Sequence, residues 1–221
     1  AERLASVLDV VYLIFNEGYS ATAGADVMRP ALQAEALRLG RLLSDLAPDE
    51  PEVLGLLALM ELHTSRARAR TDALGEPILL MDQDRRLWDR AGTERGIAAL
   101  ARAESLGGSA GPYQLQAAIA ACHARAAAAE ETDWSRIAAL YGELARRQPS
   151  PVIELNRAIA VSRAEGPAVG LLLLDELAAE PALAHYHLLP SARADLLERL
   201  GRYDEARAEF ERAASLTEND R

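Results

Sequence analysis

One helical spacing recurs along this chain and constrains its fold more than any other feature. A small residue is followed four positions later by a bulky one and three positions after that by an apolar one, so all three share a helix face. Successive occurrences begin at residues 96, 137, 170 and 206, which are 41, 33 and 36 residues apart. A separation of about 34 residues is typical of helix-turn-helix repeats that stack into a solenoid. The occurrences are Gly96/Leu100/Ala103, Gly170/Leu174/Leu177 and Ala206/Phe210/Ala213, with looser ones at Ala36/Gly40/Leu43 and Ile137/Tyr141/Leu144.

A second helical segment precedes each occurrence. We expect these segments at about residues 2–17, 51–64, 112–127, 151–164 and 188–200. Pro51, Pro112 and Pro151 stand where a first helical turn accepts proline, while Gly18 and Gly201 stand where helices end. The sequence therefore predicts an all-α fold of about five helical hairpins. We expect a single helical domain over residues 1–221, with an inserted loop at about residues 65–92.

The last hairpin resembles a tetratricopeptide (TPR) repeat. Ala194 and Leu197 occupy the positions of that motif's small and aromatic residues, and Ala206-x3-Phe210 matches its second-helix signature. Arg193 departs from the motif, which has leucine there. The resemblance implies a right-handed α-solenoid of TPR-like hairpins, in which a small residue allows two helices to cross closely and a bulky one, here Phe210, fills the facing groove.

Composition supports the helical interpretation and excludes several functions. Half of the residues are hydrophobic but only 5% are aromatic, and the net charge is -10. Binding to nucleic-acid phosphates requires an excess of Lys and Arg, so we expect no direct nucleic-acid contact. The single cysteine, Cys122, forms no internal disulfide, which favours a cytoplasmic protein. The apolar run from Val7 to Phe15 is much shorter than the roughly 20 residues of a membrane span, so we expect no membrane contact.

Residues 10–19 read VVYLIFNEGY, an apolar run that ends in a polar and aromatic turn. Because apolar residues lie on nearly every side of helix 2–17, we expect other elements to surround it. Asn16 and Glu17 then lie at its C-terminal end, beside Gly18. The helix dipole disfavours a carboxylate at that end. We therefore expect Glu17 to have a cationic partner, an arginine from the inserted loop.

The inserted loop carries the densest polar cluster around a tryptophan, DQDRRLWD at residues 82–89. In a functional interpretation, Asp82, Asp84 and Arg85 form a charge-assisted network that docks a partner or an anionic effector, with Trp88 as an aromatic anchor. In a structural interpretation, apolar side chains pin the loop to the solenoid while the charges are solvated or paired with each other. Those apolar residues are Leu79, Leu80, Leu87 and Trp88.

The sequence contains none of the common catalytic or metal-binding motifs. It has no glycine-rich phosphate loop, no nucleophile elbow and no His-Glu-x-x-His zinc helix. His185 and His187 offer two imidazoles but no third ligand at a recognisable spacing. Glu17, Asp82 and Asp84 match no acid–base pair or ion-binding loop. We therefore expect a protein that is not an enzyme and that has no metal site and no cofactor.

Three stretches carry a family resemblance: RLASVLDVVYLIFNEGYSA, PEVLGLLALMELHTSRARAR and LLMDQDRRLWDR. They resemble the C-terminal extension of a subgroup of bacterial extracytoplasmic-function (ECF) RNA polymerase sigma factors, in which a TPR-like region follows the sigma core. The similarity covers essentially the whole chain, and its most specific parts are the NEGY motif at 16–19 and the DQDR motif at 82–85. No segment resembles the promoter-reading or polymerase-binding regions. The resemblance implies that these sigma core regions lie upstream of residue 1.

On this resemblance the chain is a regulatory and interaction domain that modulates transcription initiation through protein–protein contacts. Its partners are the sigma core, RNA polymerase or both, with an unknown regulatory protein or small ligand as further candidates. A free-standing TPR-like adaptor that binds a peptide along its concave face is the alternative. The candidate partner-binding residues are Asn16, Glu17, Tyr19, Asp82, Asp84, Arg85 and Trp88.

Overall fold

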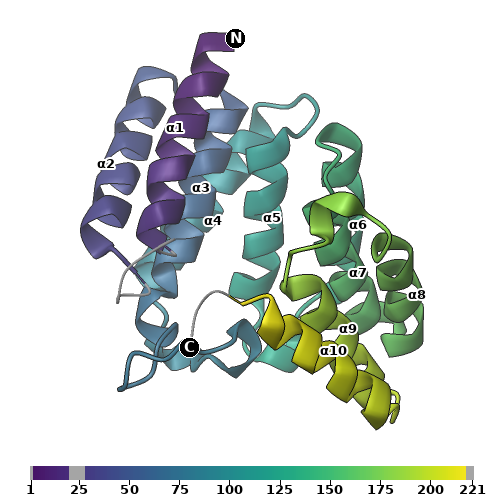
Figure 1. The fold of residues 1–221 in the computed structure, drawn as a ribbon. Helices are drawn as coiled ribbons and strands as arrows, with labels where there is room; N and C mark the ends of the chain where they lie inside the picture. Colours follow the sequence, from purple (N-terminus) through teal and green to yellow (C-terminus); the bar gives the residue numbers. More distant parts are fainter. Residues whose placement is uncertain (1, 20–27, 218–221) are drawn as a thin grey trace. The chain divides into compact units, whose positions relative to one another are not determined.

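The structure is a computed structural model that describes residues 2–19 and 28–217. Within these residues the chain forms α-helices and short 3-10 turns, and its only β pairing is an isolated bridge between Thr71 and Pro77 (Figure 1). The all-α prediction is confirmed. The α-helices are α1 (Glu2–Tyr19), α2 (Pro30–Leu46), α3 (Pro51–Ser65), α4 (Arg90–Ser105), α5 (Pro112–Arg125), α6 (Trp134–Arg147), α7 (Pro151–Glu165), α8 (Pro167–Leu177), α9 (Leu188–Arg199) and α10 (Tyr203–Ser215).

Every predicted helix is present, and local chemistry explains where the helices begin. Pro51, Pro112 and Pro151 are the first residues of α3, α5 and α7. Backbone N–H groups in the first helical turn make no hydrogen bond within the helix, so proline, which lacks this group, costs nothing there. Two other helices begin at aspartate caps. The Asp89 carboxylate accepts from the backbone N–H of Ala91 at the start of α4, and the Asp133 carboxylate accepts from the N–H of Arg136 in α6.

The helices divide into two compact units, Ala1–Thr132 with α1 to α5 and Asp133–Arg221 with α6 to α10. Within each unit, helices that are neighbours in the chain pack against each other. The predicted pairs α1/α2, α3/α4, α7/α8 and α9/α10 are confirmed as packed pairs. The predicted pairing of α5 with α6 falls across the two units and stays a prediction, as does the single-domain organisation.

Helix α3 is the centre of the first unit, where it packs against α1, α2, α4 and α5. Its side chains are buried on almost every side. Toward α1 and α2 it adds to a core of Leu8, Val11, Phe15, Ala36, Leu37, Val53, Leu56 and Met60. Toward α4 and α5 the core consists of Ala58, Leu59, Leu62, Leu100, Ala117 and Ala121.

Helices α3 and α5 approach each other so closely that only glycine fits at the contact. A Cβ atom added to Gly55 would lie 2.7 Å from the backbone nitrogen of Gln114. Next to this contact, the Glu52 carboxylate accepts hydrogen bonds from the backbone N–H groups of Tyr113 and Gln114, both at 3.0 Å. Glu52 of α3 therefore satisfies two of the free N–H groups at the start of α5. We call this arrangement of Glu52, Gly55 and the start of α5 the α3–α5 joint.

A buried carboxylate ties α3 to its two flanking helices. Glu61 of α3 is only 3% exposed, yet it accepts hydrogen bonds from Arg41 of α2 and Arg95 of α4. The shortest nitrogen–oxygen distances are 2.7 Å to Arg41 and 3.1 Å to Arg95. A buried charge is tolerated when it is paired in this way, so Glu61 links three helices in one network.

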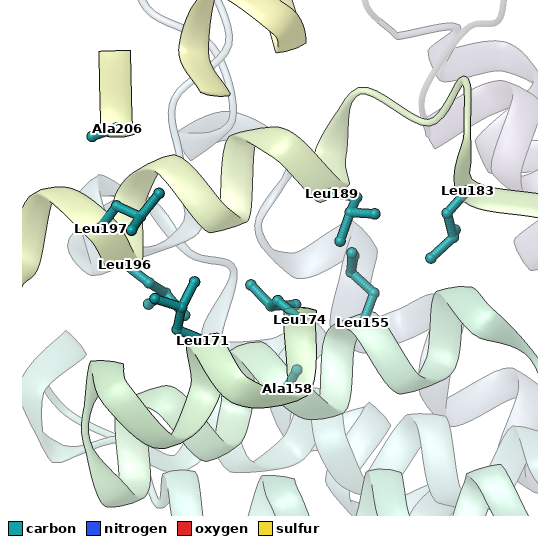
Figure 2. Close-up of a cluster of buried hydrophobic side chains, with 9 residues drawn as sticks. All are labelled: Leu155, Ala158, Leu171, Leu174, Leu183, Leu189, Leu196, Leu197 and Ala206. Carbon is teal, nitrogen blue, oxygen red and sulfur yellow. The ribbon is translucent and has the colours of Figure 1, made fainter. Parts of the chain in front are cut away.

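In the second unit, α7 packs against α6, α8 and α9, and α9 packs against α10. Figure 2 shows the leucine-rich core that these contacts bury. The α7–α8 contact again requires a small residue, because a Cβ atom on Gly170 would lie 2.3 Å from the Cβ of Ser162. On α4, a Cβ atom added to Gly96 would likewise lie 2.7 Å from the Leu62 side chain. The prediction of small residues at close helix crossings is confirmed at these two positions.

Two packing predictions are wrong. Helix α1 is not surrounded, because Val7, Val10 and Leu13 are 43%, 55% and 66% exposed while Leu8, Val11 and Phe15 form its buried face. Its neighbours α2 and α3 cover only part of its circumference (Figure 1). Phe210 is 45% exposed rather than inserted into a facing groove. It lies on α10, after which the described residues contain no further helix to cover it.

Candidate functional site

The aromatic end of α1 is held by the first residues of the inserted loop. The Arg66 guanidinium donates a hydrogen bond to the Tyr19 hydroxyl at 2.8 Å. The Arg70 guanidinium donates to the Tyr19 backbone carbonyl and lies over the Tyr19 ring, with its central carbon 3.5 Å from the ring centroid. The His63 ring of α3 packs against the same ring at a centroid distance of 5.0 Å. One cation–aromatic contact and two hydrogen bonds thus fasten the loop to α1.

Trp88, at the other end of the loop, is buried against the same arginines. It is 8% exposed, and the guanidinium carbons of Arg85 and Arg66 lie 4.8 Å and 5.8 Å from its ring centroid. Arg66 therefore contacts both Tyr19 and Trp88, which are 69 positions apart in the sequence. The structure brings together Tyr19 of the NEGY motif and Trp88 of the DQDRRLWD cluster. We call this group the Tyr19–Trp88 cluster, and its members are Tyr19, His63, Arg66, Arg70, Arg85, Trp88 and His123.

Arg85 fastens the loop to the C-terminal end of α5. Its guanidinium donates hydrogen bonds to the backbone carbonyls of His123 at 2.5 Å and Ala126 at 2.7 Å. The last carbonyls of a helix have no partner within the helix, and the helix dipole places partial negative charge there. Arg85 thus satisfies both the hydrogen-bonding need and the charge of this helix end.

The Tyr19–Trp88 cluster is locally basic although the chain as a whole is acidic. Among the described residues no carboxylate forms an ion pair with Arg66, Arg70 or Arg85; Glu130 and Glu131 act on Arg85 at longer range. Burial lowers the pKa of His123 to about 4, with the charges of Arg66 and Arg85 adding to the effect.

Burial, followed by the charges of Arg66 and Arg70, likewise holds the pKa of His63 well below its usual value. Both imidazoles are therefore neutral at pH 7. The arginines carry the positive charge of the cluster.

The prediction that Glu17 has a cationic partner is confirmed. Glu17 pairs with Arg29, at an oxygen–nitrogen distance of 2.9 Å, and this arginine lies outside the inserted loop. Arg29 directly precedes α2 and its backbone N–H donates to the Gly18 carbonyl at 2.8 Å, so chain geometry brings this cation to the end of α1. Asn16 lies one turn after Tyr12 and hydrogen-bonds its hydroxyl.

The predicted network of Asp82, Asp84 and Arg85 does not form. Asp84 caps a short 3-10 turn by accepting from the backbone N–H of Arg86, and its carboxylate pairs with the Arg86 guanidinium at 2.8 Å. The Arg85 side chain, which lies between Asp84 and Arg86 in the sequence, hydrogen-bonds to the end of α5 instead. The Asp82 side chain is exposed and makes no hydrogen bond or ion pair within the described residues.

The structural interpretation of the loop is confirmed in part. Leu79 and Leu87 are exposed, at 74% and 42%, so they do not pin the loop to the helices. Trp88 and Arg85 do, the first by burial and the second through backbone carbonyls. The charge pairing expected by the structural interpretation is present between Asp84 and Arg86.

The arginines that connect the motifs were not predicted from the sequence. Arg66 and Arg70 belong to the run RARAR at residues 66–70, in which the outer two arginines are part-buried and the middle one, Arg68, is exposed. Alternating arginines directly after an apolar helix were the available signal. The role of His123 had no such signal, because its cluster contacts come from residues 38 or more positions away.

Two further properties of the described residues concern metal ligands and membrane-spanning helices. None of their His, Cys, Asp and Glu side chains gather in a group of three that could hold a metal ion. None of the helices in residues 2–19 and 28–217 combines the length and the apolar character that crossing a membrane requires.

Comparison with known proteins gives two similarities. Residues 3–104 match the model of a family described as being of unknown function (DUF6596). Over 219 residues the chain is 51% identical to an uncharacterized protein of Rhizobium meliloti (strain 1021), an alignment that covers 99% of this chain and 51% of that protein. The chain thus spans about half the length of the curated relative it matches. No solved structure matches the chain.

Proposed function

We propose that this chain is the regulatory extension of a bacterial ECF sigma factor and that it acts by contacting the sigma core, RNA polymerase or both. In this proposal it is a cytoplasmic, non-catalytic domain whose helical hairpins stack as a right-handed, TPR-like α-solenoid. The NEGY and DQDR motifs support the proposal. The length of the Rhizobium relative also supports it, because that protein has room for a second region of similar size.

The exposed apolar face of α1 carries the proposal. Val7, Val10 and Leu13 follow each other at intervals of three residues, so they lie on one side of the helix. Their exposed fractions of 43%, 55% and 66% leave a contiguous apolar strip in water. Such a strip is a common sign of a protein–protein contact. A sigma core preceding α1 in a longer protein would be well placed to cover it.

The predicted partner-binding residues take two roles in this proposal. Tyr19, Arg85 and Trp88 hold the inserted loop against α1 and α5, so they act by positioning the loop. Asp82 is exposed on the surface of the loop, where it is free to contact a partner directly. Substituting one of these three positioning residues would alter loop structure and binding together. A substitution at Asp82 would alter binding alone.

A pull-down of the immobilised chain against the purified sigma core and against RNA polymerase, at low and moderate salt, tests the proposal. Binding through the α1 face should persist at moderate salt because screening weakens charge contacts and leaves apolar ones in place. Replacing both Val10 and Leu13 by serine should weaken binding by about tenfold or more.

Leu172→Ser on α8 is the matched control, because Leu172 is 65% exposed and Leu13 is 66% exposed. The control should bind like the unaltered chain. Equal binding by the α1 variant would refute the role of that face. If the folded chain binds neither the sigma core nor RNA polymerase, the proposal is wrong and the peptide-binding adaptor is favoured.

A further inference from the structure

A cavity of about 330 Å³ opens beside the Tyr19–Trp88 cluster. Its walls come from three elements of the first unit: the 3-10 turn of the inserted loop, the start of α4 and the end of α5. The volume falls in the range of sites for small organic ligands. The polar and aromatic residues that line it are Arg85, Arg86, Trp88, Arg90, Thr93 and Glu94.

The charges around the cavity favour an anion. Arg85, Arg86 and Arg90 line it, and Glu94 is the lining carboxylate. Asp84 offsets Arg86 through their ion pair, which still leaves more cationic than anionic groups. Arg90 is exposed and makes no hydrogen bond or ion pair to any described residue. An arginine whose donors are all available is well suited to bind carboxylate or phosphate oxygens in a bidentate manner.

Trp88 gives the cavity an aromatic wall. The residue is only 8% exposed, and the guanidinium groups of Arg85 and Arg66 lie against its ring. A ligand in the cavity would therefore lie next to the indole ring.

We propose that this cavity binds a small organic anion whose carboxylate or phosphate oxygens are held by Arg90 and Arg86, next to the Trp88 ring. The anion would join the inserted loop to α4 and α5, and would therefore order the loop that carries Asp82. The proposed site involves the cavity alone. This proposal can therefore be tested independently of the contact of α1 with a sigma core.

Fluorescence of Trp88 tests the proposal directly. A Trp134→Phe variant leaves Trp88 as the sole tryptophan, because the chain has two. This variant is titrated with citrate, with pyrophosphate and with sodium chloride at matched ionic strength. We expect a saturable change in Trp88 emission with citrate, pyrophosphate or both, and none with sodium chloride. Binding of one probe alone identifies the preferred oxygen chemistry.

Arg90→Ala in the same background should weaken that binding by about tenfold or more, because it removes an available guanidinium. Arg68→Ala is the matched control, since Arg68 is an exposed arginine of the same loop that does not line the cavity. Circular dichroism confirms that each variant is folded. A response that sodium chloride reproduces, or equal binding by the Arg90 and Arg68 variants, would overturn the proposal.

Discussion

Replacing Gly55 with alanine tests the closest helix contact in the first unit. The new Cβ would lie 2.7 Å from the backbone nitrogen of Gln114 and 2.9 Å from its Cα, whereas ordinary contacts begin at 3.4 Å. These are backbone atoms, so no side chain can rotate away to make room. Helix α5 must move off α3, and the movement lengthens both hydrogen bonds that Glu52 makes to the start of α5.

The size of the effect follows from three contributions. Forcing extra volume into a packed contact costs about 2 kcal/mol. Weakening two charge-assisted hydrogen bonds costs about 2 kcal/mol more. Alanine stabilises α3 by about 1 kcal/mol relative to glycine, because it has the higher helix propensity. We therefore expect Gly55→Ala to lower the free energy of unfolding of the first unit by about 3 kcal/mol.

Gly142→Ala on α6 is the matched control and should have the opposite sign. An added Cβ there meets nothing closer than 3.9 Å, so only the gain in helix propensity remains, about 0.5 to 1 kcal/mol. Urea unfolding followed by tryptophan emission reports on the first unit in a Trp134→Phe background and on the second in a Trp88→Phe background, since Trp88 lies in the first unit and Trp134 in the second. A neutral or stabilising Gly55→Ala substitution would refute the close α3–α5 contact.

Three further substitutions test the buried and capping groups. Glu61→Gln should lower the free energy of unfolding by about 2 kcal/mol in a urea titration, since it removes the charge that Arg41 and Arg95 share, while both arginines stay half-exposed and regain water. The pKa of His123 is about 4 in the folded chain and about 6.5 when unfolded, so the unfolded state takes up its proton first as the pH falls. Stability should be full above pH 6.5 and should fall by about 3 kcal/mol toward pH 4, a loss that His123→Gln reduces in unfolding curves at several pH values. Asp133→Ala should destabilise the second unit by about 1 kcal/mol, measured by Trp134 emission, and an unchanged midpoint would argue against its capping role.

The helices were predictable because their signals are local. Pro112 and Pro151 begin α5 and α7 as the sequence indicates, since proline at a helix start needs no partner. The small-residue spacing located Gly96 and Gly170 at close crossings, because a side chain of any size would collide with the facing helix. Both signals depend on residues within one helix and its immediate partner.

Burial and side-chain partners were less predictable because they depend on distant parts of the chain. The sequence of α1 shows an apolar residue at Val10 and at Leu13, but it does not show whether a neighbouring element covers these side chains. Tyr19 and Trp88 were both predicted as partner-binding residues, yet the residue that joins them, Arg66, lies 47 and 22 positions away from them. Such pairings arise only when the whole unit packs.

The α3–α5 joint bears on how chains of this kind can diverge. Glu52 and Gly55 fix the position of α5 directly, without relying on the segment that connects the two helices. Because loop-closure entropy rises slowly with length, the exposed turn at residues 72–76 can gain or lose residues at little cost. Gly111 has no such freedom, since an added Cβ would lie 2.2 Å from the Glu52 carboxylate carbon. Across related chains, positions 52, 55 and 111 should therefore change together or not at all, while the turn varies in length.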